Sequence, residues 1–336
     1  MKTSRIVLAQ RPHGEPTPAD LPIKTAELPE PQAGQALLET LFLSLDPYMR
    51  GRMDDLPSYA PPMQVGDTVI GGTVSRVFDC PGGELAPGDV VLGYGGWQTH
   101  SVEHVAGLRR LDPAMTEPQL ALGVLGMPGF TAYSGLLTIG KPKPGETVVV
   151  AAATGPVGSA VGQIAKIQGA RAVGIAGGPE KVAFLRELGF DAAIDRRADD
   201  FDKQLAEATP DGVDVYFENV GGAVFQSVLR RLNTFARVPV CGLVSNYNAT
   251  SLPEGPDRSG RLMGLILVKS LTVRGFIQTE FADQLDDFLR DMSGWVEQGR
   301  VKHREHVIDG LDNAVEAFNG MLRGDNFGKT LVRLAH

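Results

Sequence analysis

Residues 148–162 restrict the possible folds more than any other stretch of this 336-residue chain. An apolar run, Val-Val-Val-Ala-Ala-Ala, passes into the glycine-spaced turn Thr-Gly-Pro-Val-Gly, which opens a helix that we expect over about 159–169. In a parallel α/β sheet this order places a helix N-terminus, with its unpaired N–H groups, against the pyrophosphate of a dinucleotide. The spacing G-x-x-G-x-x-x-G differs from the usual G-x-G-x-x-G, and a strand-to-helix turn without a ligand can show it too.

The next predicted strand, 172–176, indicates which dinucleotide would bind. A site for NAD usually has Asp or Glu at the end of this strand to hold the ribose 2′-hydroxyl, but here residues 176–179 are Ala-Gly-Gly-Pro. Lys181 follows directly, and Arg196 comes after the next predicted strand, 192–194. Either cation alone could be a solvated surface charge. The two together, with no acid at the tip, complement a 2′-phosphate and favour NADPH.

The length of the chain and its pattern of short apolar runs predict two domains. A chain of 336 residues exceeds what one core usually supports. Residues 1–125 hold β-like runs at 35–45, 68–74 and 90–93 between Pro-Gly turns, which is typical of a small β-barrel domain. A helix near Leu120 is expected to cross into a second domain, 126–299. There strands alternate with helices, as in a doubly wound parallel sheet; the strands are expected at 147–152, 171–176, 191–194, 213–218, 236–243 and 271–277.

The last part of the chain contains one long loop and a predicted return to the first domain. Residues 249–262 are too rich in Pro and Gly for a helix or strand, so we expect either a functional lid or an ordinary surface loop. An amphipathic helix is expected over 281–298, and a final strand over 329–334. That strand is expected to rejoin residues 1–125, so that 300–336 belongs to the first domain.

Composition and charge exclude several classes of function. A net charge of −8 argues against a broad nucleic-acid-binding face, and no apolar run approaches the roughly 20 residues that span a bilayer. The apolar run near the N-terminus is too short to be the core of a signal peptide. Cys80 and Cys241 cannot form a disulfide framework or a structural zinc site, and His100 and His104 have no third candidate ligand nearby. We therefore expect a cytoplasmic protein with no metal and no membrane partner.

Six blocks of sequence, in order, resemble one known family over nearly the whole chain. They are LDPYMR (45–50), GMPGFTAY (126–133), the turn at 154–158, ENVGG (218–222), CGLVSNYN (241–248) and GDNFGK (324–329). The chain is similar to the zinc-independent medium-chain dehydrogenase/reductases. Within that branch it resembles the prostaglandin reductase (leukotriene B4 12-hydroxydehydrogenase) family and, most of all, bacterial NADPH-dependent curcumin reductases.

The resemblance implies an α/β chain with a GroES-like β-barrel catalytic domain and a Rossmann domain that binds NADPH. Zinc-dependent relatives need a Cys and a Gly-His-Glu segment in the first domain, whereas residues 45–48 and 70–73 here offer neither thiolate nor imidazole. Arg196 replaces a Tyr of the animal enzymes, and arginine is the stronger phosphate partner. The cofactor contacts implied by the resemblance are Gly155, Pro156, Val157, Gly158, Lys181, Arg196, Asn219, Cys241, Gly242, Ser245, Asn246, Tyr247, Phe276, Ile277, Gln278 and Asn326.

Without zinc, a hydrogen-bond donor must polarise the substrate carbonyl. A tyrosine hydroxyl suits this role because it remains protonated near pH 7. The resemblance points to Tyr247, at a strand tip that would face the nicotinamide. Tyr48, from the first domain, is the second candidate, and either ring could instead be an ordinary packed side chain.

These observations predict NADPH-dependent reduction of the carbon–carbon double bond in apolar α,β-unsaturated carbonyl compounds, by a protein that we expect to be a homodimer. Two alternatives remain open at this stage. One is an oxidoreductase for quinones or for an alcohol–ketone pair, because related zinc-free folds differ mainly in their loops. The other is an NADPH-binding protein without turnover.

Overall fold

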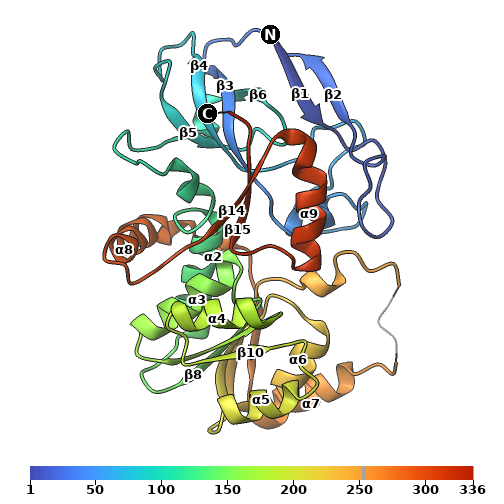
Figure 1. Ribbon diagram of the computed structural model, residues 1–336, viewed down its shortest axis with the longest axis vertical. Coiled ribbons are helices and arrows are strands. Elements are labelled where there is room, and N and C mark those ends of the chain that lie inside the picture. Colours follow the sequence, from blue (N-terminus) through green and yellow to red (C-terminus); the bar gives the residue numbers. More distant parts are fainter. Residues whose placement is uncertain (252–254, 336) are drawn as a thin grey trace. The chain divides into compact units, whose positions relative to one another are not determined.

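The computed structural model describes residues 1–251 and 255–335 of the chain. They form two compact units, one of Met1–Gly123 with Glu305–His336 and the other of Val124–Arg304 (Figure 1). None of the helices within these described ranges has the length and apolarity that a bilayer crossing demands.

The unit Val124–Arg304 is built on a six-stranded sheet in which all paired strands are parallel. The order across the sheet is β10-β9-β8-β11-β12-β13, which is the doubly wound order of dinucleotide-binding folds. The strands are β8 (Thr147–Ala151), β9 (Arg171–Ala176), β10 (Ala192–Asp195), β11 (Val213–Phe217), β12 (Leu232–Val240) and β13 (Thr272–Gly275).

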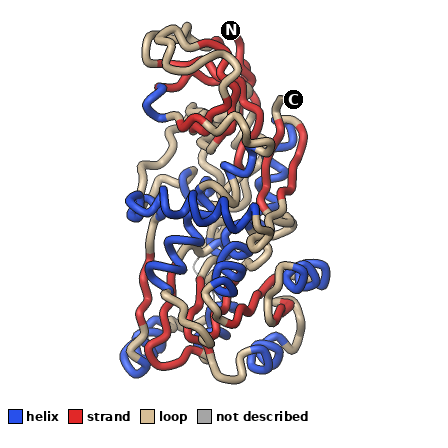
Figure 2. Tube along the Cα trace, turned by 90° about the vertical axis from the view of Figure 1, so that its left-hand side faces the viewer, coloured by secondary structure: helices blue, strands red, loops and turns tan. Residues whose placement is uncertain are grey.

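Helices flank the strands of this sheet on both sides (Figure 2). Because both faces of β8 are covered, all five of its residues are buried, which explains its unbroken apolar run. The helices are α2 (Met127–Ser134), α3 (Pro156–Ile167), α4 (Pro179–Glu187), α5 (Phe201–Ala208), α6 (Gly222–Leu229), α7 (Ser259–Lys269) and α8 (Leu285–Glu297), with a π-helical turn at Gly135–Gly140 and 3₁₀ turns at Val244–Asn246 and Gln278–Gln284.

The ring of Phe190 occupies space that two glycines leave between α3 and β9. A Cβ atom on Gly162 would lie 1.9 Å from Phe190 Cζ, and one on Gly174 would lie 2.9 Å from Phe190 Cδ1. The glycine that ends the predicted phosphate motif therefore serves the close packing of helix on sheet.

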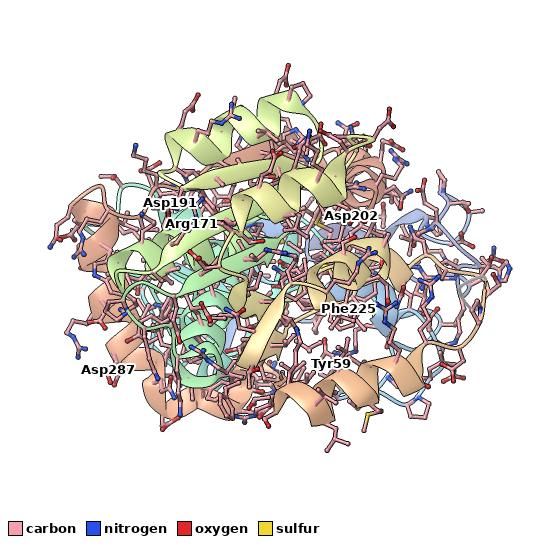
Figure 3. The ribbon with its side chains drawn as sticks, turned by 90° about the horizontal axis from the view of Figure 1, so that it is seen from below. Tyr59, Arg171, Asp191, Asp202, Phe225 and Asp287 are labelled. Atoms are coloured by element: carbon pink, nitrogen blue, oxygen red, sulfur yellow. The ribbon has the colours of Figure 1, made fainter. Side chains whose placement is uncertain are left out.

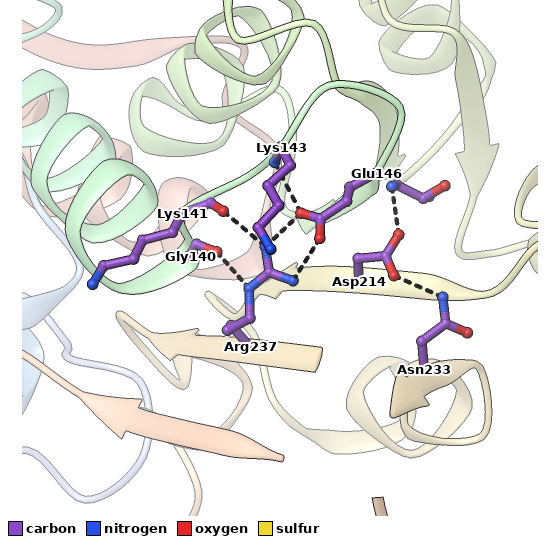
Figure 4. Close-up of polar contacts among 8 residues, drawn as sticks. Gly140, Lys141, Lys143, Glu146, Asp214, Asn233 and Arg237 are labelled. Atoms are coloured by element: carbon purple, nitrogen blue, oxygen red, sulfur yellow. Dashed lines mark hydrogen bonds and ion pairs between the residues drawn. The ribbon is translucent and has the colours of Figure 1, made fainter. Parts of the chain in front are cut away.

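Charged and polar side chains bind one another and the backbone near the amino-terminal ends of the strands. Arg237 pairs with Glu146 and donates to the carbonyl of Gly140, while Asp214 accepts the Thr147 N–H at 2.9 Å (Figure 4). These polar groups all have hydrogen-bond partners within the protein. In a sheet of this kind, ligands bind at the opposite end, where the strands have their carboxyl ends.

A second polar contact joins α3 to the strands β9 and β10. Asp191 accepts the Ala172 N–H and a hydrogen bond from Lys166, both at 2.7 Å. The same carboxylate lies beside Arg171 (Figure 3). Because these groups bind one another, they form a structural ion-pair network rather than a ligand site.

The unit Met1–Gly123 with Glu305–His336 contains a two-stranded sheet, β1-β2, and a mainly antiparallel seven-stranded sheet, β14-β15-β3-β4-β5-β7 with β6 also on β3. Its strands are β1 (Lys2–Ile6), β2 (Ile23–Glu27), β3 (Gln35–Ser44), β4 (Thr73–Asp79), β5 (Val90–Gly93), β6 (His100–His104), β7 (Arg109–Arg110), β14 (Glu305–Asp309) and β15 (Lys329–Arg333). Its helices are α1 (Tyr48–Arg52) and α9 (Ala314–Arg323), with 3₁₀ turns at Val105–Gly107, Pro118–Leu122 and Leu311–Asn313. The final strand, β15, pairs antiparallel with β3.

Several predicted boundaries were wrong. Helix α3 begins at Pro156 rather than 159, since proline is well suited to the first helical position. The run 68–74 is not one strand, because β4 begins at Thr73 after two glycines that add no side chain to a ladder. Near Leu120 there is only a 3₁₀ turn, and the longer helix starts at Met127.

The expectation that 249–262 holds no regular element was also wrong. Helix α7 starts inside it at Ser259, where the side chain of Asp257 accepts the N–H and the hydroxyl of Ser259. Residues 252–254 of the predicted loop lie outside the described part of the chain. Towards the C-terminus, the helix expected over 281–298 begins at Leu285, after a 3₁₀ turn.

Candidate functional site

The turn between β8 and α3 has the form of a phosphate-binding loop. Ala152 has a φ of +50°, and Gly155 donates its N–H to the Ala152 carbonyl at 3.0 Å. A Cβ atom on Gly158 would lie only 2.4 Å from that carbonyl, so glycine is required for the first helical turn to come this close. Within the described residues, no side chain caps α3 and no acid lies in its first turn. Its N–H groups are therefore suited to an anionic ligand. Pro156 and Val157, the other predicted contacts of this turn, are half-buried.

Two arginines lie over the tip of β9. A Cβ atom on Gly177 would be 3.1 Å from Nε of Arg197 and 3.3 Å from Nε of Arg196. Lys181 lies in the first turn of α4, which starts two residues beyond Gly177. The sequence analysis predicted Arg196 as a phosphate contact but not Arg197, because a single sequence does not show which of two adjacent arginine side chains lies over the end of β9.

A carboxylate also lies beside this tip, although residues 176–179 contain none. Asp195 accepts the N–H groups of Gly178 and Arg197, both at 2.9 Å. Burial alone would raise its pKa, but these two hydrogen bonds and the neighbouring arginines lower it. Asp195 is thus ionised and turned toward backbone N–H groups, where it helps to fix the loop that carries the arginines.

The tips of β8, β11 and β12 are joined by hydrogen bonds. The Asn219 side-chain amide donates to the Ala151 carbonyl at 2.9 Å. The N–H groups of Cys241 and Gly242 donate to the Glu218 carbonyl at 2.9 and 3.2 Å. Three strand ends that are distant in sequence are therefore held next to the phosphate-binding turn.

The hydroxyl of Tyr247 lies against this joined backbone. A Cβ atom on Gly242 would be 3.3 Å from Tyr247 Oη and 3.6 Å from the carbonyl oxygen of Asn219. Ser245 and Asn246, which precede Tyr247, are exposed on the same loop. Tyr247 itself is half-buried, so its ring is held by the loop while remaining partly accessible.

Two predicted cofactor contacts have side chains that are built into the fold. Burial, with the nearby Glu218, raises the pKa of the Cys241 thiol to about 12, so this thiol is inert at neutral pH. The Phe276 ring is buried with its centroid 6.2 Å from that of Phe217. Any contact of Phe276 with a cofactor would therefore involve its backbone, whereas Cys241 is half-buried. Ile277 and Gln278, just after β13, are half-buried.

Tyr48 and Asn326 belong to the other unit. Tyr48 opens α1, where burial and the nearby Asp46 raise the pKa of its phenol well above the usual range. Asp46 is held in place by the fully buried Lys329, whose Nζ lies 2.7 Å from Asp46 Oδ1. The side chain of Asn326 donates to the Gly328 carbonyl at 2.9 Å.

No group of three or more His, Cys, Asp or Glu side chains within the described residues is arranged to hold a metal ion. His100 and His104 occupy the two ends of β6, the first half-buried and the second exposed.

Comparison with known proteins agrees with this geometry. Residues 4–111 match a family model described as the N-terminal domain of oxidoreductase, and residues 156–293 match one described as zinc-binding dehydrogenase. The chain is 53% identical over 336 residues to the NADPH-dependent curcumin reductase of Escherichia coli K12, covering 99% of this chain and 97% of that protein. It is 42% identical over 325 residues to prostaglandin reductase 1 of Rattus norvegicus, covering 95% of each. The chain belongs to the medium-chain dehydrogenase/reductase family.

Within this family of oxidoreductases the fold likeness extends to a solved structure. The crystal structure of CurA in complex with NADPH, from Vibrio vulnificus, matches with a TM-score of 0.96 and 50% identity over 99% of both chains. The predicted resemblance to the curcumin and prostaglandin reductases, and the predicted combination of an N-terminal domain with a Rossmann domain, are thereby confirmed.

Proposed function

We propose that this protein reduces the carbon–carbon double bond of apolar α,β-unsaturated ketones and aldehydes, with NADPH as the reductant. The observation that carries the proposal is the placement of the Tyr247 hydroxyl on the backbone of Gly242, among strand tips that adjoin a phosphate-binding turn. The names of its relatives, curcumin reductase and prostaglandin reductase, support the same substrate class.

The residues at the carboxyl ends of the sheet fit NADPH. The N-terminus of α3, which packs against the backbone of Ala152 because Gly158 has no Cβ atom, would hold the pyrophosphate. Arg196, Arg197 and Lys181 would hold the 2′-phosphate through charge-assisted hydrogen bonds. The remaining contacts would come from Asn219, the 241–247 loop and the 276–278 segment, with Asn326 from the other unit. When bound, NADPH supplies the hydride that reduces the substrate at its β-carbon.

Tyr247 acts in this proposal as the donor to the substrate carbonyl. Negative charge develops on that oxygen as the substrate becomes an enolate, and a hydroxyl aimed at it stabilises the transition state. One such donor contributes about 3–4 kcal/mol when it resembles an oxyanion-hole donor. The α-carbon of the enolate then takes up a proton that derives from solvent, and no dedicated acid is assigned to this step. Tyr48 is the alternative donor, because its phenol also remains protonated at working pH.

We propose that the unit Val124–Arg304 is the NADPH-binding domain and that the other unit supplies substrate contacts. We also propose that catalysis needs no zinc, although one matching family model is described as zinc-binding. The reason is that residues 45–48 and 70–73 lack the cysteine and histidine ligands that such a site requires. Dialysis against a strong chelator should leave activity unchanged, and loss of activity together with a stoichiometric zinc ion would contradict this.

We further propose that the protein is a cytoplasmic homodimer. The cytoplasmic location is supported by two cysteines that are both free thiols. The dimer is supported by β13, which ends the sheet order and has all four residues exposed. Leu267 and Val268 on α7 are each 79% exposed and adjoin this edge in sequence. An unpaired edge beside exposed apolar side chains is suited to a second copy of the chain.

A panel of electron acceptors tests the proposed reaction. We expect oxidation of NADPH, followed by its absorbance, with open-chain enones and enals, together with formation of the saturated carbonyl product. Quinones and saturated ketones serve as the comparison acceptors. Turnover of quinones without turnover of enones would show that the protein is a quinone oxidoreductase. Tight NADPH binding without oxidation by any acceptor would favour a binding protein.

A further inference from the structure

Glu218 is a buried carboxyl group that the proposed reaction does not use. It follows β11, and the residue is only 1% exposed. Acidic side chains are almost never buried to this degree unless they bind specific partners. Burial raises the pKa of this carboxyl despite hydrogen bonds from backbone N–H groups that lower it. Because a carboxyl group is costly to bury, we expect Glu218 to bind specific partners at the end of β11.

The two carboxyl oxygens of Glu218 have different surroundings. Oε1 accepts the N–H of Val220 at 2.6 Å and that of Gly221 at 2.9 Å. Oε2 and the hydroxyl of Tyr216, two positions earlier, are both inaccessible to solvent. The two groups lie close to each other, and the Tyr216 hydroxyl lowers the pKa of the carboxyl. The backbone N–H groups of the turn that directly follows β11 are accepted by Oε1.

That turn carries the loop at the end of β12. The N–H of Val244 donates to the Asn219 carbonyl at 3.2 Å, and the N–H and hydroxyl of Ser245 donate to the Val220 carbonyl at 3.1 and 2.6 Å. Gly221 has a φ of +79°, a backbone conformation that favours glycine. The turn therefore needs glycine at this position as well as an acceptor for its N–H groups. The 241–247 loop is thus held by carbonyl groups whose orientation depends on the Glu218 carboxyl.

Tyr247 ends this loop, and its hydroxyl and the Asn219 carbonyl both lie against Gly242, since each is within 4 Å of the position that a Cβ atom on Gly242 would take. Displacement of the 219–221 turn would move both backbone groups that flank the hydroxyl. A donor that is misplaced by about 1 Å loses much of its effect on a transition state.

We propose that Glu218 is a positioning residue, which holds the Asn219–Gly221 turn by accepting its N–H groups and thereby places the hydroxyl of Tyr247. The inference rests on the proposed function, since it assigns that hydroxyl a role in catalysis. Glu218 touches neither substrate nor cofactor in this account and acts only through the loop.

Three variants of the full-length protein test this. Glu218→Met retains the volume and removes the acceptor, whereas Glu218→Gln retains one carbonyl oxygen that can accept both N–H groups. Tyr216→Phe is the comparison variant, because it removes the hydroxyl beside the carboxyl and leaves the two N–H groups that Oε1 accepts in place. Should Glu218→Met fail to fold, Glu218→Asp withdraws the acceptor by one methylene group and is expected to show a smaller effect in the same direction.

The first readout needs neither cofactor nor substrate. Amide hydrogen exchange of residues 219–222 and 241–247 should speed up in Glu218→Met, while exchange in β8 and β9 stays unchanged. Glu218→Gln and Tyr216→Phe should exchange like the wild type. A general loss of stability would instead raise exchange throughout the sheet. Because this readout is independent of turnover, it decides the positioning role even if enones prove not to be the substrates.

The second readout separates kcat from cofactor binding. Glu218→Met should lower kcat by about 10- to 100-fold, because the donor is displaced. The Kd for NADPH, from fluorescence titration, should change far less, because the turn at Gly155–Gly158 and the arginines are unaltered. Glu218→Gln should restore kcat. Unchanged exchange and kcat in Glu218→Met would overturn the proposal, and so would Glu218→Gln as impaired as Glu218→Met.

Discussion

The hydroxyl of Tyr247 is the single atom group on which the proposed chemistry depends most. Tyr247→Phe retains the ring and removes only the donor, which acts mainly in the transition state. We expect kcat and kcat/KM to fall together by up to about 100- to 1,000-fold, with KM nearly unchanged. Steady-state kinetics with an enone and a fluorescence titration of NADPH measure both effects.

Tyr48→Phe is the matched comparison for this prediction. Full kcat in Tyr247→Phe, combined with a collapse in Tyr48→Phe, would assign the donor role to the other unit. Full activity in both single variants and in the double variant would mean that neither phenol polarises the carbonyl.

The choice of NADPH over NADH also depends on single residues. Replacing Lys181, Arg196 and Arg197 together by Ala should raise the KM for NADPH by about tenfold or more, because charge-assisted hydrogen bonds to the 2′-phosphate are lost. The KM for NADH should change much less. Arg186→Ala, which removes an exposed cation from the last turn of α4, is the control. An equal loss of affinity for both cofactors would contradict the role of these cations.

At the scale of elements, the sequence predicted most strands of the parallel sheet and the glycine-spaced turn after β8, because both follow from local patterns. Valine runs identify buried strands, and glycines identify turns. The start of α7 was missed because the prolines and glycines before Ser259 hid the pattern of the helix. The burial of the Phe276 ring against Phe217 was missed because burial depends on contacts between segments far apart in the sequence.

The packing of α3 on β9 makes a prediction at this scale. Gly162→Ala should lower the free energy of unfolding by about 1–3 kcal/mol, because the new methyl group would overlap the ring of Phe190. Gly294→Ala in α8 is the matched control, since among the described residues only the tip of Gln298 comes within 4 Å of a Cβ atom there. That change should be neutral or stabilise the helix by up to about 1 kcal/mol.

Urea denaturation measures both glycine variants. Combining Gly162→Ala with Phe190→Leu should recover part of the lost stability, because the smaller side chain leaves room for the methyl group. If Gly162→Ala were as stable as Gly294→Ala, the close contact between α3 and Phe190 would not be what requires glycine at this position.

At the scale of the whole molecule, the exposed face of α7 and β13 predicts the oligomeric state. Changing Leu267 and Val268 together to Glu should convert the proposed dimer into a monomer, as measured by size-exclusion chromatography with light scattering. Phe78→Glu is the control, because Phe78 is 59% exposed and lies on β4, in the other unit. A wild-type protein that is monomeric at micromolar concentration would refute the dimer directly.

The proposed reaction as a whole makes a prediction about where one atom goes. With NADPH deuterated at C4 of the nicotinamide on the transferred side, and an open-chain enone as substrate, NMR of the product should locate the label at the β-carbon. The α-carbon should carry hydrogen from solvent, and a parallel reaction in heavy water should label that position instead. An allylic alcohol with deuterium on the carbon that bears its hydroxyl group would show ketone reduction, and would contradict enone double-bond reduction as the activity of this protein.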